Sequence, residues 1–230
     1  MPVHILSRKI CKFFLFLFLV AFSLVSLDAQ AQRMSRSAAV TEVGDNIPDQ
    51  QLVQRLRKGG LVILFRHGFT DHSQSDSRSR DHADCSIQRN LDAKGCRESQ
   101  ETGMAFKKLG IPVGDVFTSP KCRTRDTGLE AFGRAENLSF LFINHAEAKD
   151  QRRAFLGTIP EDGKNVTAIS HGSRIKAMVW FERGPSGPWS GQIQEGDAIV
   201  LEPLGDSKFK FLAKVEPEDW LRLQKNYSSK

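Results

Sequence analysis

Three short segments of the chain carry histidine and arginine side chains, and each directly follows a stretch that predicts a β-strand. They are Arg66-His67-Gly68, Ser119-Pro120-Lys121-Cys122-Arg123 and His171-Gly172-Ser173. In an open parallel sheet, ligands bind at the carboxyl ends of the strands. We therefore expect two histidines and two arginines to meet at one edge of a sheet.

This set of side chains is suited to phosphoryl transfer. A neutral imidazole is a nucleophile at neutral pH because one ring nitrogen carries a free lone pair. Arginine presents paired N–H donors that match phosphate oxygens, and the glycine after His67 would let the backbone approach an anion closely. A second histidine, His171, would add positive charge when protonated. None of these steps requires a metal ion.

The motifs resemble those of the histidine phosphatase superfamily, also called phosphoglycerate mutase-like proteins. The resemblance extends over about residues 50–220. It is strongest to secreted bacterial members with Cys-x-x-Gln-Arg-x-Leu and Cys-Arg-Thr stretches, here at 85–91 and 122–124. The other matching motifs are Arg66-His67-Gly68, Leu91-Asp92-x-x-Gly95, Ser119-Pro120-x-x-Arg123-x-x-x-Thr127 and His171-Gly172.

The resemblance implies a role for each residue of the site. His67 would take up the phosphoryl group, and water would then hydrolyse the phosphohistidine. Arg66, Arg123 and His171 would complete the phosphate pocket. Further substrate contacts would come from Gly68, Ser119 and Gly172. The resemblance implies neither a cofactor nor a metal ion.

The chain departs from the family at the group that protonates the leaving oxygen. Many members use a glutamate or an aspartate, and no clear motif for one is present here. Glu147 and Asp150 lie in roughly the corresponding part of the chain, and we favour Glu147. The departure leaves open a catalytically silent module that only binds a phosphorylated ligand.

Each residue of the cluster also has a structural interpretation when it is taken singly. His67 could be a core histidine bonded to a carbonyl, His171 could cap a helix, and Arg123 could pair with a surface carboxylate. An arginine that ends a buried strand, as Arg66 does, is costly unless it meets an anion. The four together favour a phosphate site.

The segment from 68 to 90 predicts a long polar loop, because it holds almost nothing apolar to bury. Loops of that length in a compact domain are usually functional or disordered. Its histidines and carboxylates suggest zinc or manganese ligands, but their spacing fits no known ligand framework. We therefore favour a solvated loop over the active site. The residues concerned are Asp71, His72, Asp76, Asp81, His82 and Asp84.

Elements that alternate between strand and helix patterns predict a three-layer α/β/α sandwich with a mostly parallel central sheet. Apolar runs predict strands at 61–65, 116–118, 139–143 and 165–170, and a late hairpin at 198–201 and 209–215. Helical patterns cover 48–58, 92–109, 120–132, 147–156 and 173–181, with Gly110 as a C-cap. We expect one domain at 47–225.

The amino-terminal segment has the three parts of a secretory signal. A basic region is followed by the apolar run 13–27 and by Ala29-Gln30-Ala31, a small-x-small cleavage pattern. We expect a signal peptide at 1–31 and a polar linker at 32–46, and hence a periplasmic or secreted protein. The alternative is a retained anchor, for which the apolar run is short.

The charge of the chain suits small anionic ligands. The net charge is +6, and the predicted signal, with three cations and one carboxylate, accounts for +2 of it, which leaves +4. This excess is too small and too scattered for nucleic acid. We expect a phosphorylated small molecule, glycan or envelope lipid as partner, and no membrane span after signal cleavage.

Three cysteines remain after the predicted signal, and an exported domain could pair two of them. Cys96 falls within a predicted helix and is the expected spare thiol. We therefore expect a bond between Cys85 and Cys122, although spacing alone does not fix connectivity.

The sequence thus predicts an exported, metal-independent phosphatase that hydrolyses phosphate monoesters through His67. Besides the silent binding module, the alternatives are a phosphotransferring mutase and a phosphohistidine-protein phosphatase. Export argues against the phosphohistidine-protein phosphatase. It also argues against the mutase, which needs a phosphorylated metabolite as donor, because an exported protein would seldom meet one.

Overall fold

The structure, a computed structural model, describes residues 46–77, 81–143, 146–161, 163–180 and 193–228. The predicted signal peptide at 1–31 and positions 32–45 of the predicted linker lie outside the described residues, so both stay predictions. Within the described part of the chain, no helix combines the length and the apolar character needed to cross a membrane.

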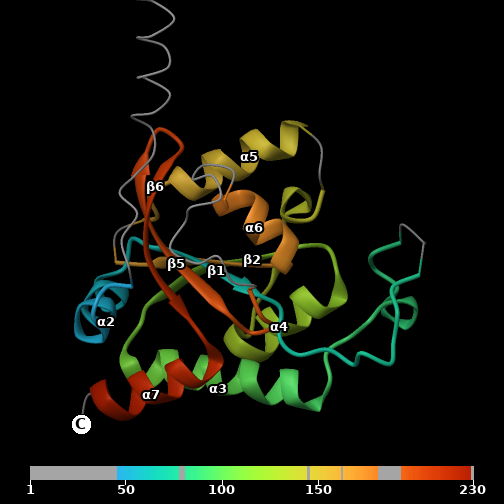
Figure 1. Cartoon of the computed structure of the whole chain (residues 1–230), viewed down its shortest axis with the longest axis horizontal. Coiled ribbons are helices and arrows are strands. Elements are labelled where there is room, and N and C mark those ends of the chain that lie inside the picture. The colour runs from blue at the N-terminus through green and yellow to red at the C-terminus, as the bar shows by residue number, and fades with distance from the viewer. Residues whose placement is uncertain (1–45, 78–80, 144–145, 162, 181–192, 229–230) are drawn as a thin grey trace, which may run out of the picture. The chain divides into compact units, whose positions relative to one another are not determined.

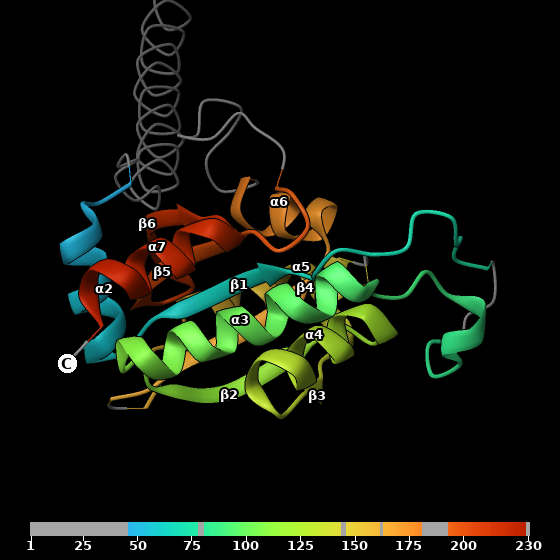
Figure 2. The ribbon, with the colours of Figure 1, turned by 90° about the horizontal axis from the view of Figure 1, so that it is seen from below.

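A six-stranded sheet forms the centre of the domain (Figure 1), with the order β3-β2-β4-β1-β5-β6 (Figure 2). The first four strands in this order are parallel, and the last two run antiparallel to their neighbours. The strands are β1 (Val62–Arg66), β2 (Val113–Thr118), β3 (Glu136–Asn137), β4 (Asn165–Ser170), β5 (Ala198–Gly205) and β6 (Lys208–Val215). The mostly parallel sheet and the late hairpin are confirmed.

Helices cover both faces of this sheet, because the central strands are apolar on both sides. In β1, Ile63 and Phe65 belong to a core shared with α2, α3 and α7, whereas Val62 and Leu64 belong to a second core shared with α5 and α6. Figure 2 shows α3, α4 and α7 across one face. The helices are α2 (Asp49–Lys58), α3 (Ala93–Leu109), α4 (Cys122–Phe132), α5 (Ala146–Gly157), α6 (Gly172–Trp180) and α7 (Pro217–Tyr227). The predicted three-layer sandwich is confirmed.

Helix α3 begins and ends close to where its sequence predicts. The Asp92 side chain accepts a hydrogen bond from Gly95 N at 2.7 Å, and Gly110 ends the helix at a φ of 68°, a conformation that glycine adopts without strain. Gly95 is also required by packing, since a Cβ there would lie 2.1 Å from the Phe69 carbonyl oxygen. The helix therefore packs directly against the backbone that follows His67.

The predicted strand at 139–143 is wrong. Ser139–Leu141 forms a 3-10 turn, and the third strand is the two-residue β3, which pairs with β2 at the sheet edge. Leu141 is fully buried in the core beneath α5, and Phe140 packs against the same core. The apolar run therefore reflects burial of a helical turn rather than a sheet position.

Helix α7 was not predicted, although its sequence carries start signals. Pro217 occupies the first turn, and Glu216 N donates to the Asp219 carboxylate at 3.0 Å. Trp220 and Leu223 are buried in the core shared with α3. Glu216 and Asp219 form a capping box, and this pair of residues three positions apart is the sequence signal that could have identified the helix.

Candidate active site

The three motif segments meet at the carboxyl edge of the parallel strands. The neighbouring strands β1, β4 and β2 stay paired just beyond their ends, where His67 N donates to Ser170 O at 3.1 Å and Ser119 N donates to Ile169 O at 3.0 Å. The rings of His67 and His171 lie 5.3 Å apart between centroids. The topology thus brings together side chains that are far apart in sequence.

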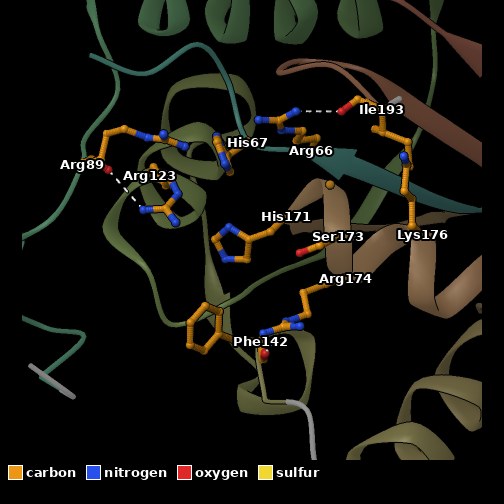
Figure 3. A pocket seen from close by; sticks show the side chains of 11 residues that line it. Arg66, His67, Arg89, Arg123, Phe142, His171, Ser173, Arg174, Lys176 and Ile193 are labelled. Atoms are coloured by element: carbon orange, nitrogen blue, oxygen red, sulfur yellow. Dashed lines mark hydrogen bonds between the residues drawn. The ribbon is translucent and has the colours of Figure 1, made fainter. Parts of the chain in front are cut away.

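A cavity of about 400 Å³ lies at this edge (Figure 3). Five members of the predicted site line it: Arg66, His67, Arg123, His171 and Gly172. The further lining residues are Arg89, Phe142, Ser173, Arg174, Lys176 and Ile193. The lining described here contains five cationic side chains and no carboxylate.

Three predicted site residues are not in the lining. Gly68 N donates to Thr127 Oγ1 at 3.0 Å, and Ser119 Oγ lies 2.8 Å from His171 Nε2, so both support the lining residues from behind. Glu147 is exposed on α5. The sequence favoured Glu147 as the acid, and its carboxylate is not part of the cavity wall.

His67 is held in the state that a nucleophile requires. Its Nδ1 lies 2.9 Å from Gly68 O, and because a carbonyl only accepts, Nδ1 carries the hydrogen and Nε2 keeps a lone pair. Burial, together with nearby Arg123 and Arg66, lowers the pKa of His67 to about 3. The imidazole is therefore neutral at neutral pH.

His171 is neutral for the same reason. Burial lowers its pKa, and the neighbouring His67 and Arg123 lower it further. Its ring packs edge-on against Phe142, with 5.3 Å between centroids, while the bond to Ser119 fixes the other side. Packing and hydrogen bonding together orient the ring toward the cavity.

Arg66 and Arg123 are each fixed by groups at their terminal nitrogens. Arg66 Nη1 donates to Ile193 O at 2.7 Å and Nη2 to Glu195 Oε1 at 3.1 Å. Arg123 donates from both Nη atoms to Asp76, at 2.9 and 3.1 Å. Both guanidinium groups therefore keep a defined orientation before a ligand arrives.

Arg89 is a third arginine of this wall, and the sequence interpretation gave it no role. Its Nη2 lies 3.6 Å from Glu195 Oε1. The Nε atoms of Arg66, Arg89 and Arg123 are all buried, and none has a hydrogen-bond partner in the described part of the chain. Orphaned buried donors are rare and costly. The three arginines line one cavity whose described lining holds no carboxylate, and guanidinium groups gathered in this way suit an oxyanion ligand.

Glu195 is the buried carboxylate behind this wall, and the sequence interpretation missed it. Its side chain is 4% exposed. It accepts hydrogen bonds from Thr70 N at 3.2 Å and Thr70 Oγ1 at 2.9 Å, besides its contacts with Arg66 and Arg89. Although burial opposes ionisation, the hydrogen bond from Thr70 and the nearby charge of Arg66 lower the pKa of Glu195. Glu195 precedes β5, and because β5 runs antiparallel to β1, the start of β5 lies at the same edge as the end of β1.

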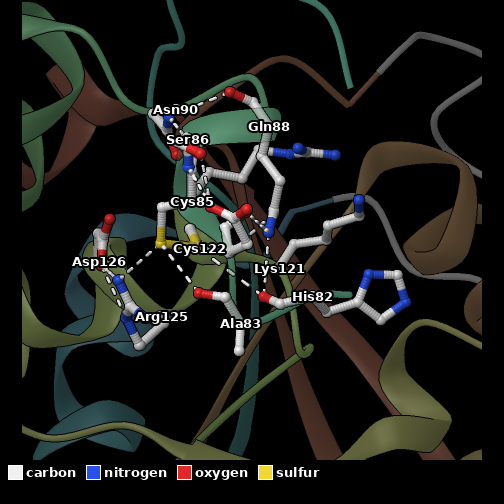
Figure 4. The surroundings of a disulfide bond; sticks show 12 residues. His82, Ala83, Cys85, Ser86, Gln88, Asn90, Lys121, Cys122, Arg125 and Asp126 are labelled. Carbon is white, nitrogen blue, oxygen red and sulfur yellow. Dashed lines mark hydrogen bonds and ion pairs between the residues drawn. A yellow bond between two sulfur atoms is a disulfide. The ribbon is translucent and has the colours of Figure 1, made fainter. Parts of the chain in front are cut away.

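The loop from 68 to 90 is tied to the site by the disulfide Cys85–Cys122 (Figure 4). The predicted pairing is confirmed, and Cys96 is the free cysteine among the described residues. Gln88 Oε1 also accepts from Cys122 N at 3.1 Å. Since Arg123 follows Cys122, the bond anchors Arg89 and Arg123 to each other. Over the ranges that the structure describes, no group of three or more His, Cys, Asp or Glu side chains could hold a metal ion.

The structure defines the class of fold: the chain has the fold of the histidine phosphatases. It is similar to the protein histidine phosphatase SixA in complex with tungstate, with a TM-score of 0.53 and 20% identity over 69% of this chain and 98% of that chain. It is also similar to a proposed alpha-ribazole-5′-P phosphatase from Escherichia coli, with a TM-score of 0.50 and 12% identity over 66% of this chain and 95% of that one. No family model and no curated protein sequence matches the chain.

Proposed function

We propose that the protein is a phosphatase that hydrolyses phosphate monoesters through a phosphohistidine on His67. The observation that carries the proposal is the cavity itself, which brings the guanidinium groups of Arg66, Arg89 and Arg123 together with a neutral histidine and holds no carboxylate in its described lining. Donors of this kind match phosphate oxygens. A neutral imidazole beside them can attack the phosphorus that they bind.

The reaction runs in two displacements. His67 Nε2 uses its lone pair to form a bond to phosphorus, and the ester P–O bond breaks with its electrons on the leaving oxygen. The leaving oxygen takes up a proton from solvent. Water then attacks the same phosphorus and releases a proton to solvent, the P–N bond breaks, and Nε2 regains its lone pair. Arg66, Arg89 and Arg123 hold the phosphoryl oxygens through both steps.

His171 changes its charge during this cycle. A bound phosphate dianion places negative charge beside the ring and raises its pKa, which burial had lowered. Substrate binding and protonation of His171 therefore favour each other. The protonated ring stabilises the charge of the transferring group.

Protonation of the leaving group sets the range of substrates. The cavity lining that the structure describes holds no carboxylate that could donate a proton to the leaving oxygen. Esters whose leaving alcohol or phenol has a low pKa are therefore the best substrates. The same feature supports the second candidate, a binding module that holds a phosphorylated ligand without turnover.

We place this activity outside the cytoplasm, in the periplasm or after secretion. The signal predicted at 1–31 supports this location, and so does the Cys85–Cys122 bond, because disulfides persist mainly in oxidising compartments. The substrate class that we infer is a phosphorylated small molecule, glycan or envelope lipid, handled without a metal ion.

The test is phosphate release from p-nitrophenyl phosphate, whose leaving group needs little protonation. We expect His67→Ala to lower kcat by about a thousand-fold or more, while EDTA leaves the rate unchanged. The control is Lys107→Gln, which alters an exposed side chain of α3. Equal rates for His67→Ala and the parent, or full inhibition by EDTA, would contradict the proposal. Vanadate binding without product would establish the binding module instead.

A further inference from the structure

Helix α6 forms a second cationic wall of the cavity, apart from the arginines beside His67. Arg174 and Lys176 both line the cavity, and α6 begins there at Gly172. In Figure 3 the Arg174 side chain lies beyond His171 as seen from His67. Phe142 contacts both, since its ring centroid is 5.3 Å from that of His171 and 5.7 Å from Arg174 Cζ.

Arg174 differs from the other arginines of the cavity in its electrostatic partners. Arg66 and Arg89 share Glu195, and Arg123 is paired with Asp76. Arg174 instead donates Nε to a carbonyl, Phe142 O, at 2.8 Å. Among the described residues no carboxylate forms an ion pair with it.

A second arginine increases the positive potential at this wall. Arg152 is 5% exposed and donates from Nη1 to Phe140 O at 2.8 Å and to Ile143 O at 2.6 Å. Burial lowers the pKa of Arg152, and the charge of Arg174 lowers it further. Arg152 thus fixes the segment whose carbonyl orients Arg174. The charges of Arg152 and Arg174 therefore act on each other across this segment.

The cavity has room and charge for more than one phosphate group. Its volume of about 400 Å³ lies in the range that holds a whole small ligand. Three arginines and two histidines are enough to bind the phosphoryl group that is transferred. The α6 wall adds Arg174 and the positive end of a nine-residue helix, while Lys176 lines the cavity on the side of Ile193 (Figure 3).

We propose that the α6 wall is a subsite for a second anionic group on the leaving part of the substrate, with Arg174 as its principal ligand. This inference rests on the proposed phosphatase activity. The substrate class is therefore a phosphate monoester that carries a carboxylate or a second phosphate, such as an acidic sugar phosphate.

The test compares glucose 1-phosphate with glucuronic acid 1-phosphate, which replaces one hydroxymethyl group by a carboxylate. We expect the parent enzyme to prefer the acidic sugar in kcat/KM by roughly 10- to 100-fold, the range of a charged hydrogen bond. Arg174→Gln should reduce this ratio to about one, chiefly by raising KM for the acidic sugar. Glucose 1,6-bisphosphate should respond in the same direction.

Two further variants keep the test decisive. Arg174→Lys, which retains the charge, should restore most of the preference, and Arg174→Glu should reverse it. Arg97→Gln, an exposed change on α3, is the matched control, and thermal unfolding confirms that each variant folds. An equal fall for both sugars in Arg174→Gln, or no preference in the parent, would overturn the subsite. In either case turnover of p-nitrophenyl phosphate would leave the proposed function standing.

Discussion

The histidines and the arginines of the cavity are all potential cations, yet the fold keeps the histidines neutral and the arginines charged. His67 and His171 are buried, and their pKa values are lowered, so both rings stay neutral. Arg66 and Arg123 instead donate to carboxylates that balance their charge. The difference teaches that one pocket can supply an uncharged nucleophile and charged oxyanion receptors side by side, if burial acts on the first and ion pairing on the second.

The largest expected effect concerns the histidines and is a loss of stability in acid. The pKa of His67 is 6.5 in a model peptide and about 3 in the fold, so between these values the unfolded chain binds more protons than the native one. The free energy of unfolding should therefore fall as pH decreases through this window, by about 1.4 kcal/mol per pH unit for this one group.

Urea unfolding between pH 7.5 and 4 measures this effect. The side chain of the His67→Gln variant cannot titrate. Its free energy of unfolding should therefore fall by about 1.4 kcal/mol less per pH unit than that of the parent. An unchanged slope in the variant would mean that His67 is not held neutral by burial.

The next effect concerns the carboxylate behind the arginines. Glu195→Gln removes the charge and places an amide N–H₂ among the donors of Thr70, Arg66 and Arg89. We expect kcat/KM for p-nitrophenyl phosphate to fall by roughly 10- to 100-fold, because a buried hydrogen bond to a charged group is lost and Arg66 is misoriented. Glu218→Gln, an exposed change on α7, is the control.

A pH profile separates positioning from a purely structural role for Glu195. Without this negative charge, the pKa of His67 should fall further, so the acidic limb of kcat/KM should move to lower pH. A variant that loses stability but keeps the parent profile would show that Glu195 only stabilises the fold.

The smallest effect concerns the exposed partner of Arg123. Asp76 is 37% exposed in its side chain, and it occupies the donors that a phosphate would use. Asp76→Asn should lower the inhibition constant of inorganic phosphate by about two- to five-fold, a small change because exposed ion pairs are weak. Asp71→Asn on the same loop is the control. Weaker phosphate binding in Asp76→Asn would show instead that Asp76 is needed to orient Arg123.

The strand ends were the predictable part of the site. Arg66, His67 and His171 follow buried apolar runs, and parallel pairing alone brings such ends together. The run at 139–143 has a similar composition, but it begins as a 3-10 turn just after the two-residue edge strand β3, where core contacts rather than pairing decide its conformation. Periodicity does not distinguish these two cases.

The supporting residues were less predictable for a topological reason. Glu195 approaches Arg66 only because β5 inserts antiparallel beside β1, which no local pattern specifies. Arg89 and Asp76 lie in a polar loop whose course depends on a disulfide. Their sequence neighbourhood indicated a loop over the site, but not which of its charges enter the cavity.

The Cys85–Cys122 bond also has a consequence for the maturation of the protein. The strands hold the two imidazole rings whether or not the thiols are oxidised, whereas without the disulfide a hydrogen bond from Arg123 Nη1 to Arg89 O, at 3.2 Å, is the direct link between these two arginines. In a newly made, reduced chain, His67 should therefore reach its final position before Arg89 and Arg123 can bind phosphate tightly. Phosphate titrations of the reduced chain before and after reoxidation would reveal this delay, and equal affinities would exclude it.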